Sequence, residues 1–396
     1  MARIATIVGV TALTVTMAGC WEQPGYDAGH TRYNPDETAL TAANVHELVE
    51  LWSTDTGDAP VQGPLSVNGT IYAVTPETGS APNRAVAVDA ATGGVDWSTD
   101  LTEAASTTVN DPVHIDGRLV VPYEYFKWGG YATVTAGSGA VVADSAPNTG
   151  TWALAVLDGD LVTTGFGYGS AVPTPFGYTV DGPCTAGIGG LIQYDPQPRR
   201  DFAYVGSDLM WNRDTAAAGF VGCDPGTGQY ANQWNTELGA VPTGVAAVGD
   251  VRVVYTAADG TLTLLDAASG AVGWATEVGT ALSPPAVAGG TVFTTTADGR
   301  LVAVDAATGS VQWEATVGAP GTLAVAGDVV YVAPDGGSTV LAFDGDGCGN
   351  ATCPSLASVP AGAEITSGPI VDAGRLVVGT ADGHLAAFGL QHRGAP

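Results

Sequence analysis

Short runs in which apolar residues alternate with Thr, Ser or Gly make up most of this chain, and turn residues separate them. The run TLTLLD at residues 261–266, between Asp259-Gly260 and Gly270, is typical. Such alternation between turn signals predicts half-buried strands joined by hairpins. Apolar residues at helical spacing are nearly absent, and a short helix is expected only around residues 42–48. The pattern predicts an all-β fold.

The same turn phrase occurs three times with identical spacing. Residues 87–93, 264–270 and 303–309 read AVDAATG, LLDAASG and AVDAATG, and a Trp follows each Asp by eight positions. The Asp side chain can cap the turn and the Gly can adopt a positive φ, so the phrase predicts a hairpin that leads into an outer strand. We expect tryptophans of outer strands to dock between neighbouring sheets, and the candidates are Trp52, Trp97, Trp274 and Trp313.

Further turns define the size of the repeating unit. A second turn, such as Asp298-Gly299, lies at a fixed interval before the Asp of the repeated turn phrase. A third turn lies before the second one in each unit. Three turns give four antiparallel strands in a unit of about 40 to 45 residues, which is typical of a propeller blade. Degenerate copies of the phrase bring the predicted number of blades to eight. Asp195 and Asp224 are too close in sequence for four full strands, so seven blades with an insertion is the alternative.

The two ends of the chain are predicted to share one blade. Residues 370–390 supply early strands but no Trp, whereas residues 51–53 supply an outer strand without a hairpin partner. Pairing the two would close the ring and hide its open edges. The predicted organisation is a signal peptide at 1–19, a lipidated tether and entry segment at 20–47, one β-propeller at 48–390 and a tail at 391–396.

The first twenty residues are typical of an export signal. Residues 4–17 are apolar after Arg3, and Ala18-Gly19-Cys20 precedes a polar, turn-rich stretch. The apolar run is shorter than the about 20 residues of a membrane span, and the small residues suit a signal peptidase. Residues 17–20 resemble a bacterial lipobox, with Met17 where Leu is usual. We expect lipidation of Cys20 and attachment to the outer face of a membrane; plain secretion and an uncleaved anchor are the alternatives.

The remaining cysteines are even in number, as expected for disulfides in an oxidising compartment. Three pairings are possible. The preferred pairing joins Cys348 to Cys353 inside one turn and Cys184 to Cys223 across a longer excursion. Zinc is the weaker alternative, because neither pair has CxxC spacing or a nearby histidine.

The charge balance argues against one class of partner. The chain has 40 acidic and 12 basic residues and a net charge of −28, and nucleic-acid binding needs clustered Lys and Arg. Nucleic acid is therefore not an expected partner. The five histidines are scattered without metal-ligand spacing, and no GxSxG elbow occurs. We expect no catalytic, cofactor-binding or metal-binding residues.

One region does not fit the repeat. Residues 122–131 read PYEYFKWGGY and hold five aromatic residues and the only lysine, Lys127. Long hairpins in adjacent blades could combine these aromatics into a platform for a glycan, a peptide or an apolar partner. Burial of the same aromatics against the ring is the favoured alternative. The candidate partner-binding residues are Tyr123, Tyr125, Phe126, Trp128, Tyr131, Phe166 and Tyr168.

The pattern DxxTGxxxW resembles the tryptophan-docking repeat of pyrroloquinoline-quinone-type β-propellers. The resemblance runs from Trp21 to Leu390 and includes GHTRYNP at 29–35 and the turn from Gly347 to Cys353. It implies a quinoprotein-like propeller. Quinoprotein dehydrogenases, an outer-membrane-assembly lipoprotein and sensor domains all use this fold, so the resemblance leaves the activity open.

The dehydrogenases of this family resemble one another in the groups that hold their cofactor. They have a disulfide between adjacent cysteines over the cofactor, and carboxylate and amide ligands for calcium below it. No two cysteines are adjacent here, and no CxxCH haem-attachment motif occurs. The sequence favours a non-catalytic binding or scaffolding module for a protein or cell-envelope partner. A quinone- or metal-dependent oxidoreductase is the alternative.

Overall fold

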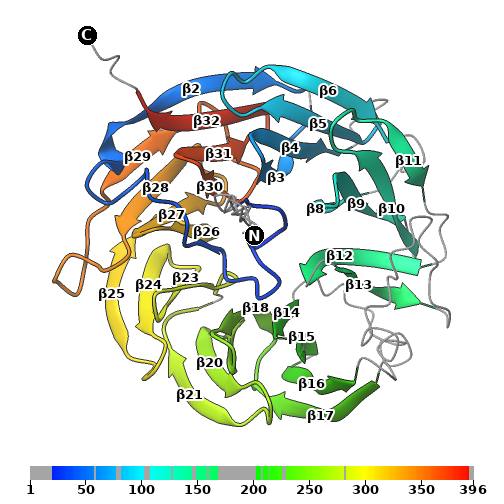
Figure 1. Cartoon of the computed structure of the whole chain (residues 1–396). Coiled ribbons are helices and arrows are strands. Elements are labelled where there is room, and N and C mark those ends of the chain that lie inside the picture. Colours follow the sequence, from blue (N-terminus) through cyan, green and yellow to red (C-terminus); the bar gives the residue numbers. More distant parts are fainter. Residues whose placement is uncertain are drawn as a thin grey trace, which may run out of the picture.

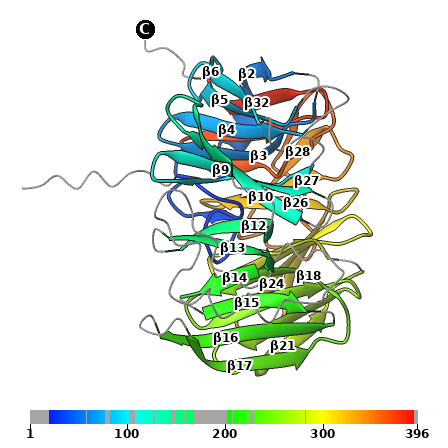
Figure 2. The same ribbon diagram turned by 90° about the vertical axis from the view of Figure 1, so that its right-hand side faces the viewer.

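The strands of the protein form separate antiparallel sheets that stand radially around one axis (Figure 1). The structure is a computed structural model that describes residues 20–391, apart from 58, 77–81, 102–107, 126–127, 145–148, 158–159, 168–201, 207, 214, 225–228 and 281. From the side, the ring is a thick disc whose strands run between its two faces (Figure 2). The predicted β-propeller is confirmed.

The described residues contain eight sheets, which we number in chain order around the ring. Sheet 1 is β3 (Gln62–Val67), β4 (Thr70–Thr75), β5 (Arg84–Asp89) and β6 (Val95–Asp100). Sheet 2 is β7 (Thr108–Val109), β8 (Val113–Ile115), β9 (Arg118–Tyr125), β10 (Trp128–Thr135) and β11 (Val141–Asp144). Sheet 3 is β12 (Thr149–Leu157) and β13 (Asp160–Gly167). Sheet 4 is β14 (Phe202–Val205), β15 (Asp208–Arg213), β16 (Ala216–Asp224) and β17 (Gln229–Glu237).

The second half of the ring is more regular. Sheet 5 is β18 (Pro242–Val248), β19 (Arg252–Ala257), β20 (Thr261–Asp266) and β21 (Val272–Glu277). Sheet 6 is β22 (Ala286–Ala288), β23 (Thr291–Thr295), β24 (Arg300–Asp305) and β25 (Val311–Thr316). Sheet 7 is β26 (Gly321–Ala326), β27 (Val329–Pro334), β28 (Thr339–Asp344) and β29 (Ala357–Pro360), with β1 (Tyr33–Asn34) added in parallel to β26. Sheet 8 is β30 (Ile370–Asp372), β31 (Arg375–Gly379), β32 (His384–Leu390) and β2 (Leu48–Asp55).

Sheet 3 differs from the others because it has only two described strands. It leads into residues 168–201, which are outside the described residues. Eight sheets agree with the eight predicted units, and the number of complete four-stranded blades stays a prediction.

Burial separates the inner strands from the outer strand of each sheet. Residues 301–304 of β24 are all buried, because neighbouring sheets pack on both faces of that strand. In the outer strand β25, exposed Gln312 precedes buried Trp313. The inner strands therefore read as nearly continuous apolar runs, and the outer strands show the period-2 alternation that the sequence displays.

The two ends of the chain share sheet 8. Strand β2 lies antiparallel to β32, with Trp52 opposite Ala387 and Glu50 opposite Phe388, and Figure 1 shows β2 as the outermost strand there. The predicted closure is confirmed. Because this pairing covers the edge of β32, it fastens the ring.

The expected helix near residues 42–48 is a single 3-10 turn, η1 (Val45–Glu47). Strand β2 begins at Leu48, which leaves no room for a second helical turn. Among the residues that the structure describes, none forms a helix long and apolar enough to cross a bilayer.

Tryptophans of outer strands join neighbouring sheets. Trp97 Nε1 donates a hydrogen bond to the Ala136 carbonyl at 2.7 Å, and Thr99 Oγ1 donates one to the Gly139 carbonyl at 2.7 Å. A Cβ at Gly139 would lie 2.6 Å from the Trp97 indole, so only glycine fits beneath the ring. The same arrangement places Trp52 on Ala90, Trp274 on Ala306 and Trp234, from a degenerate repeat, on Ala267.

The junction between sheets 6 and 7 is built differently. Trp313 is 3% exposed, and its Nε1 has no hydrogen-bond partner among the described residues. Instead, the main chain of Glu314 accepts a hydrogen bond from Cys353 N and donates one to the Ala351 carbonyl, both at 2.8 Å. The predicted disulfide between Cys348 and Cys353 closes the loop that makes this bridge. A disulfide-bonded loop therefore takes over the role of the indole hydrogen bond.

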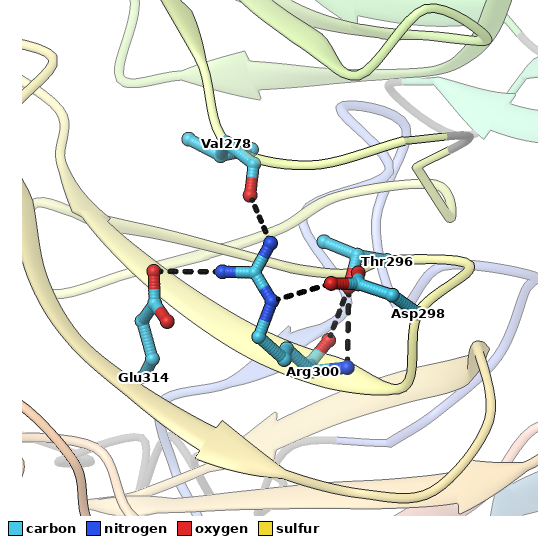
Figure 3. A network of polar contacts seen from close by, with 5 residues as sticks. All are labelled: Val278, Thr296, Asp298, Arg300 and Glu314. Atoms are coloured by element: carbon cyan, nitrogen blue, oxygen red, sulfur yellow. Dashed lines mark hydrogen bonds and ion pairs between the residues drawn. The ribbon is translucent and has the colours of Figure 1, made fainter.

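Arg300, at the beginning of β24, connects sheet 6 to sheet 5 by a hydrogen bond (Figure 3). Its Nη2 donates to the Val278 carbonyl, its Nε lies against Asp298 and its Nη1 against Glu314, each at 2.9 Å. The guanidinium is about one-third exposed, so solvent screens these ion pairs and their main role is geometric.

Candidate functional site: the axial segment and the cavity beneath it

Residues 20–37, here called the axial segment, cross the middle of the ring and bind the innermost strand of every sheet. In six sheets a carbonyl of the segment accepts an inner-strand N–H at 2.8 to 3.0 Å. The pairs are Ser66 with Trp21, His114 with Glu22, Tyr204 with Ala28, Ala247 with Gly29, Val287 with Thr31, and Val325 with Arg32.

Side chains of the axial segment serve the other two sheets. Gln23 Oε1 accepts a hydrogen bond from Val156 N at 2.7 Å, and its Nε2 donates to the Val156 carbonyl at 3.2 Å. Asn34 Nδ2 donates to the Val371 carbonyl at 2.8 Å. In all eight sheets the bonded residue is the penultimate residue of the innermost strand. The segment therefore pairs backbone groups that would otherwise line the axis unpaired.

Backbone conformation lets the axial segment curve inside the ring. Gly25, Tyr26, His30 and Arg32 all have positive φ, between 52° and 75°. Such values turn the chain sharply, and three of these four residues are not glycine. Tertiary hydrogen bonds therefore hold this curve.

A cavity of about 340 Å³ lies against the axial segment. The segment contributes Trp21, His30 and Arg32 to its wall. Most of the residues that the sheets contribute lie at or near the beginning of an innermost strand, such as Gln62, Thr322 and Ile370. Leu65 and Leu154 lie farther along their strands. Because the segment binds the other end of these strands, it closes the cavity on one side. A volume near 340 Å³ is at the lower end of small-molecule sites.

The axial segment contributes polar groups of His30 and Arg32 to the cavity, and the sheets contribute Gln62, Asn110, Asp111 and Thr322. Burial lowers the pKa of His30 to about 3, so the imidazole is neutral near pH 7. Its ring packs against Phe202 with centroids 5.2 Å apart, and its buried Nε2 has no hydrogen-bond partner in the part of the chain that the structure describes. Arg32 Nη1 donates to the Pro285 carbonyl at 2.9 Å. Burial raises the pKa of the nearby Asp27 carboxyl, which accepts hydrogen bonds from Thr31.

The donor set of this cavity does not fit a quinone held on calcium. Calcium needs six to eight oxygen ligands, largely from carboxylates and amides. Asp111 is the single carboxylate residue in the described wall, and Gln62 and Asn110 add only two amides, which leaves the side-chain oxygens well short of that number. The described residues also contain no cluster of three His, Cys, Asp or Glu side chains. The two cysteines of the observed disulfide are also not adjacent in sequence.

Two residues of the predicted aromatic platform are buried, and the side chains of the others are outside the described part of the structure. Tyr123 and Tyr131 are 3% and 2% exposed and belong to the core, in agreement with the alternative of burial against the ring. Tyr125, Trp128 and Phe166 lie in strands, but their side chains are outside the described part. Phe126 and Tyr168 are outside it altogether.

The other predicted site residues are partly visible. Cys20 has a half-buried thiol, and burial raises its pKa. Cys184 and the side chain of Cys223 are outside the described residues, so their pairing stays a prediction. The sequence predicted a tether and entry segment at 20–47 but neither its hydrogen bonds to every sheet nor a role for His30, although the GHTRYNP stretch departs from the repeat and carries one of only five histidines.

Comparisons with known proteins agree with this fold. Residues 217–394 match the family model of outer membrane protein assembly factor BamB, and residues 21–169 match that of the glucose/ethanol/alcohol dehydrogenase β-propeller domain. No curated protein has a significantly similar sequence. Quinohemoprotein alcohol dehydrogenase from Comamonas testosteroni is similar in structure, with a TM-score of 0.67, 14% identity and coverage of 95% of this chain and 81% of the other.

A computationally designed protein, Ika8, is also similar, with a TM-score of 0.63, 16% identity and coverage of 86% of this chain and 99% of the other. At such identities these structures show the fold alone. The two family models together span most of the ring. The chain is therefore a β-propeller similar to those that are built from pyrroloquinoline-quinone-type repeats.

Proposed function

We propose that this protein is an exported, lipid-anchored propeller that acts as a non-catalytic binding or scaffolding module for a protein or cell-envelope partner. One observation carries the proposal: the chain's own axial segment fills the middle of the ring and is hydrogen-bonded to every sheet. The space that remains has a donor set unsuited to a quinone on calcium. The exposed loops are then the main surface available for function.

The match to the assembly-factor family model supports a protein partner. That model covers residues 217–394, where the repeats are most regular. The name of the family describes assembly of outer membrane proteins, and we transfer to this chain only the idea of a protein partner in the envelope.

Attachment through Cys20 is the testable part of the localisation. The full chain should be produced in a bacterial host that processes lipoproteins, and its intact mass measured. The expected mass lacks residues 1–19 and carries lipid on Cys20. A Cys20→Ser variant should lose both the lipid and sedimentation with membranes. An unmodified Cys20 in the membrane fraction would contradict the proposal.

A quinoprotein dehydrogenase is the second candidate, because residues 21–169 match a dehydrogenase propeller model. Titration of the full chain with pyrroloquinoline quinone and calcium separates the two candidates. We expect no saturable change in the absorbance of the quinone and no rise in Tm. A saturable change in both would favour the dehydrogenase.

A further inference from the structure

The two faces of the ring differ in how the axial segment meets them. The segment binds the penultimate residue of each innermost strand, so it lies near the face where these strands end. We call this the tether face; it carries the turns at Asn68-Gly69, Gly249-Asp250 and Gly327-Asp328. Most of the sheet residues that line the cavity lie at or near the beginning of an innermost strand in sheets 1, 2, 7 and 8, so the cavity lies toward the opposite, open face.

Cys20, the predicted lipidation site, is held close to the turns of the tether face. Cys20 Sγ lies 4.0 Å from Asn68 Oδ1, at the tip of the β3–β4 turn. The next residue, Trp21, is 3% exposed, and its carbonyl accepts a hydrogen bond from Ser66 N at 3.0 Å. Its indole also packs edge-on against Tyr26, with centroids 5.3 Å apart. Cys20 is therefore held at the level of the turn tips and not on a flexible stalk.

This geometry restricts how a lipid-bearing ring can sit on a membrane. An acyl chain attached to Cys20 must reach the hydrocarbon region, and one residue of chain spans at most about 3.6 Å. The turns beside Cys20 must then come within a few ångströms of the headgroups.

We propose that the tether face lies against the lipid headgroups and that the cavity opens away from the membrane. This inference rests on the lipidation of Cys20 in the proposed function, and it adds the orientation of the ring.

Charge does not supply the attraction to this surface. The exposed turns of the tether face carry several carboxylates, among them Asp116, Asp250, Asp266, Asp328 and Asp346. Like charges repel an anionic bilayer, so the acyl chains must hold the face in place. An unlipidated chain is therefore expected not to adsorb to phosphatidylglycerol vesicles.

Two exposed aspartates at opposite ends of β19 offer matched reporters of orientation. Asp250 precedes the strand on the tether face, and Asp259 follows it on the open face. Six residues of strand separate the two faces by about 20 Å. Asp250→Lys and Asp259→Lys each place a reactive amine on one face of the same sheet.

The lipidated chain is added to preformed phosphatidylcholine vesicles and treated with a membrane-impermeant amine acylating reagent. Mass spectrometry of peptides then compares labelling on vesicles with labelling in detergent. We expect position 250 to lose most of its labelling on vesicles and position 259 to keep it. Equal labelling at both positions, or protection of position 259 alone, would overturn the orientation.

A spacer and a synthetic anchor complete the test. Ten Gly and Ser residues inserted between Cys20 and Trp21 add a flexible linker of about 17 Å, so position 250 should be labelled again while the protein stays bound.

If the cell does not lipidate Cys20, the proposed anchoring fails. The orientation is then tested separately, on a chain starting at Cys20 whose thiol is coupled to a maleimide phospholipid.

Discussion

Trp274 and Gly309 lie in different sheets, and the Trp274 indole covers the glycine so closely that a Cβ there would be 2.7 Å from the ring. Trp274 Nε1 also donates to the Ala306 carbonyl at 3.1 Å, and Thr276 Oγ1 donates to the Gly309 carbonyl at 2.8 Å. These contacts join sheet 5 to sheet 6. They explain why the phrase needs its Gly and its Trp at a fixed spacing.

Gly309→Ala should destabilise the ring more than Gly289→Ala. Both glycines have positive φ, 73° and 57°, so each alanine has a similar backbone cost of about 1 kcal/mol. Only the alanine at 309 also meets an indole, because the position of a Cβ at 289 is open. We expect an additional loss of about 1 to 3 kcal/mol at 309, measured by denaturant unfolding. Equal losses would show that the docking contact contributes nothing.

Trp234→Phe should cost more than Trp313→Phe. Both indoles are buried, but Trp234 Nε1 donates to the Ala267 carbonyl at 2.8 Å, whereas Trp313 Nε1 has no partner. Phenylalanine removes the indole N–H donor in both variants. In Trp234→Phe the carbonyl of Ala267 also loses its hydrogen bond from the indole. The expected difference in the free energy of unfolding is about 1 kcal/mol. A larger loss at Trp313 would contradict the assignment of the bridge to the disulfide loop.

Removal of the disulfide should loosen the junction between sheets 6 and 7. For a loop as short as the one between Cys348 and Cys353, chain entropy gives about 2 kcal/mol. We expect the Cys348→Ser and Cys353→Ser double variant to unfold at a lower Tm than the native chain. Comparison of both proteins with and without reductant separates this disulfide from any other. An unchanged Tm in the double variant would show that the loop holds the bridge without its crosslink.

His30 should make the protein less stable as the pH falls from about 6.5 to about 3. The ordinary pKa of 6.5 applies to the unfolded chain, and burial lowers the folded value to about 3. Between these values the unfolded state binds more protons, so acid favours unfolding, by up to about 1.4 kcal/mol per pH unit. The buried Asp27 acts in the opposite direction, because its pKa is raised.

His30→Gln isolates this contribution, because it removes the titrating ring and retains Asp27 and the neighbouring Arg32. The free energy of unfolding is measured for both proteins at pH 7 and pH 4.5. The native chain should lose more stability between the two pH values than the variant. Equal losses would mean that His30 is accessible to protons in the folded state.

Much of the architecture was predictable from the sequence. Residues 87–97, 264–274 and 303–313 repeat one turn, in which the Asp caps the turn, the Gly adopts a positive φ and the Trp docks on the next sheet. These residues lie within eleven positions of one another, so the sequence alone shows the pattern. The missing outer strand after Leu390 and the isolated strand at Trp52 predicted ring closure for the same reason. The Cys348 to Cys353 crosslink was also a local feature.

The axial segment was not predictable, because its partners are far away in the sequence. Asn34 binds the carbonyl of Val371, which is 337 residues away in the sequence, and no sequence pattern predicts that contact. Burial of Tyr123 and Tyr131 and the unpaired indole of Trp313 likewise depend on which neighbouring sheet meets each side chain. Local alternation and turn chemistry determined the sheets. Only the closed ring created an axis with unpaired backbone groups, and so decided where the axial segment, the cavity and Cys20 lie.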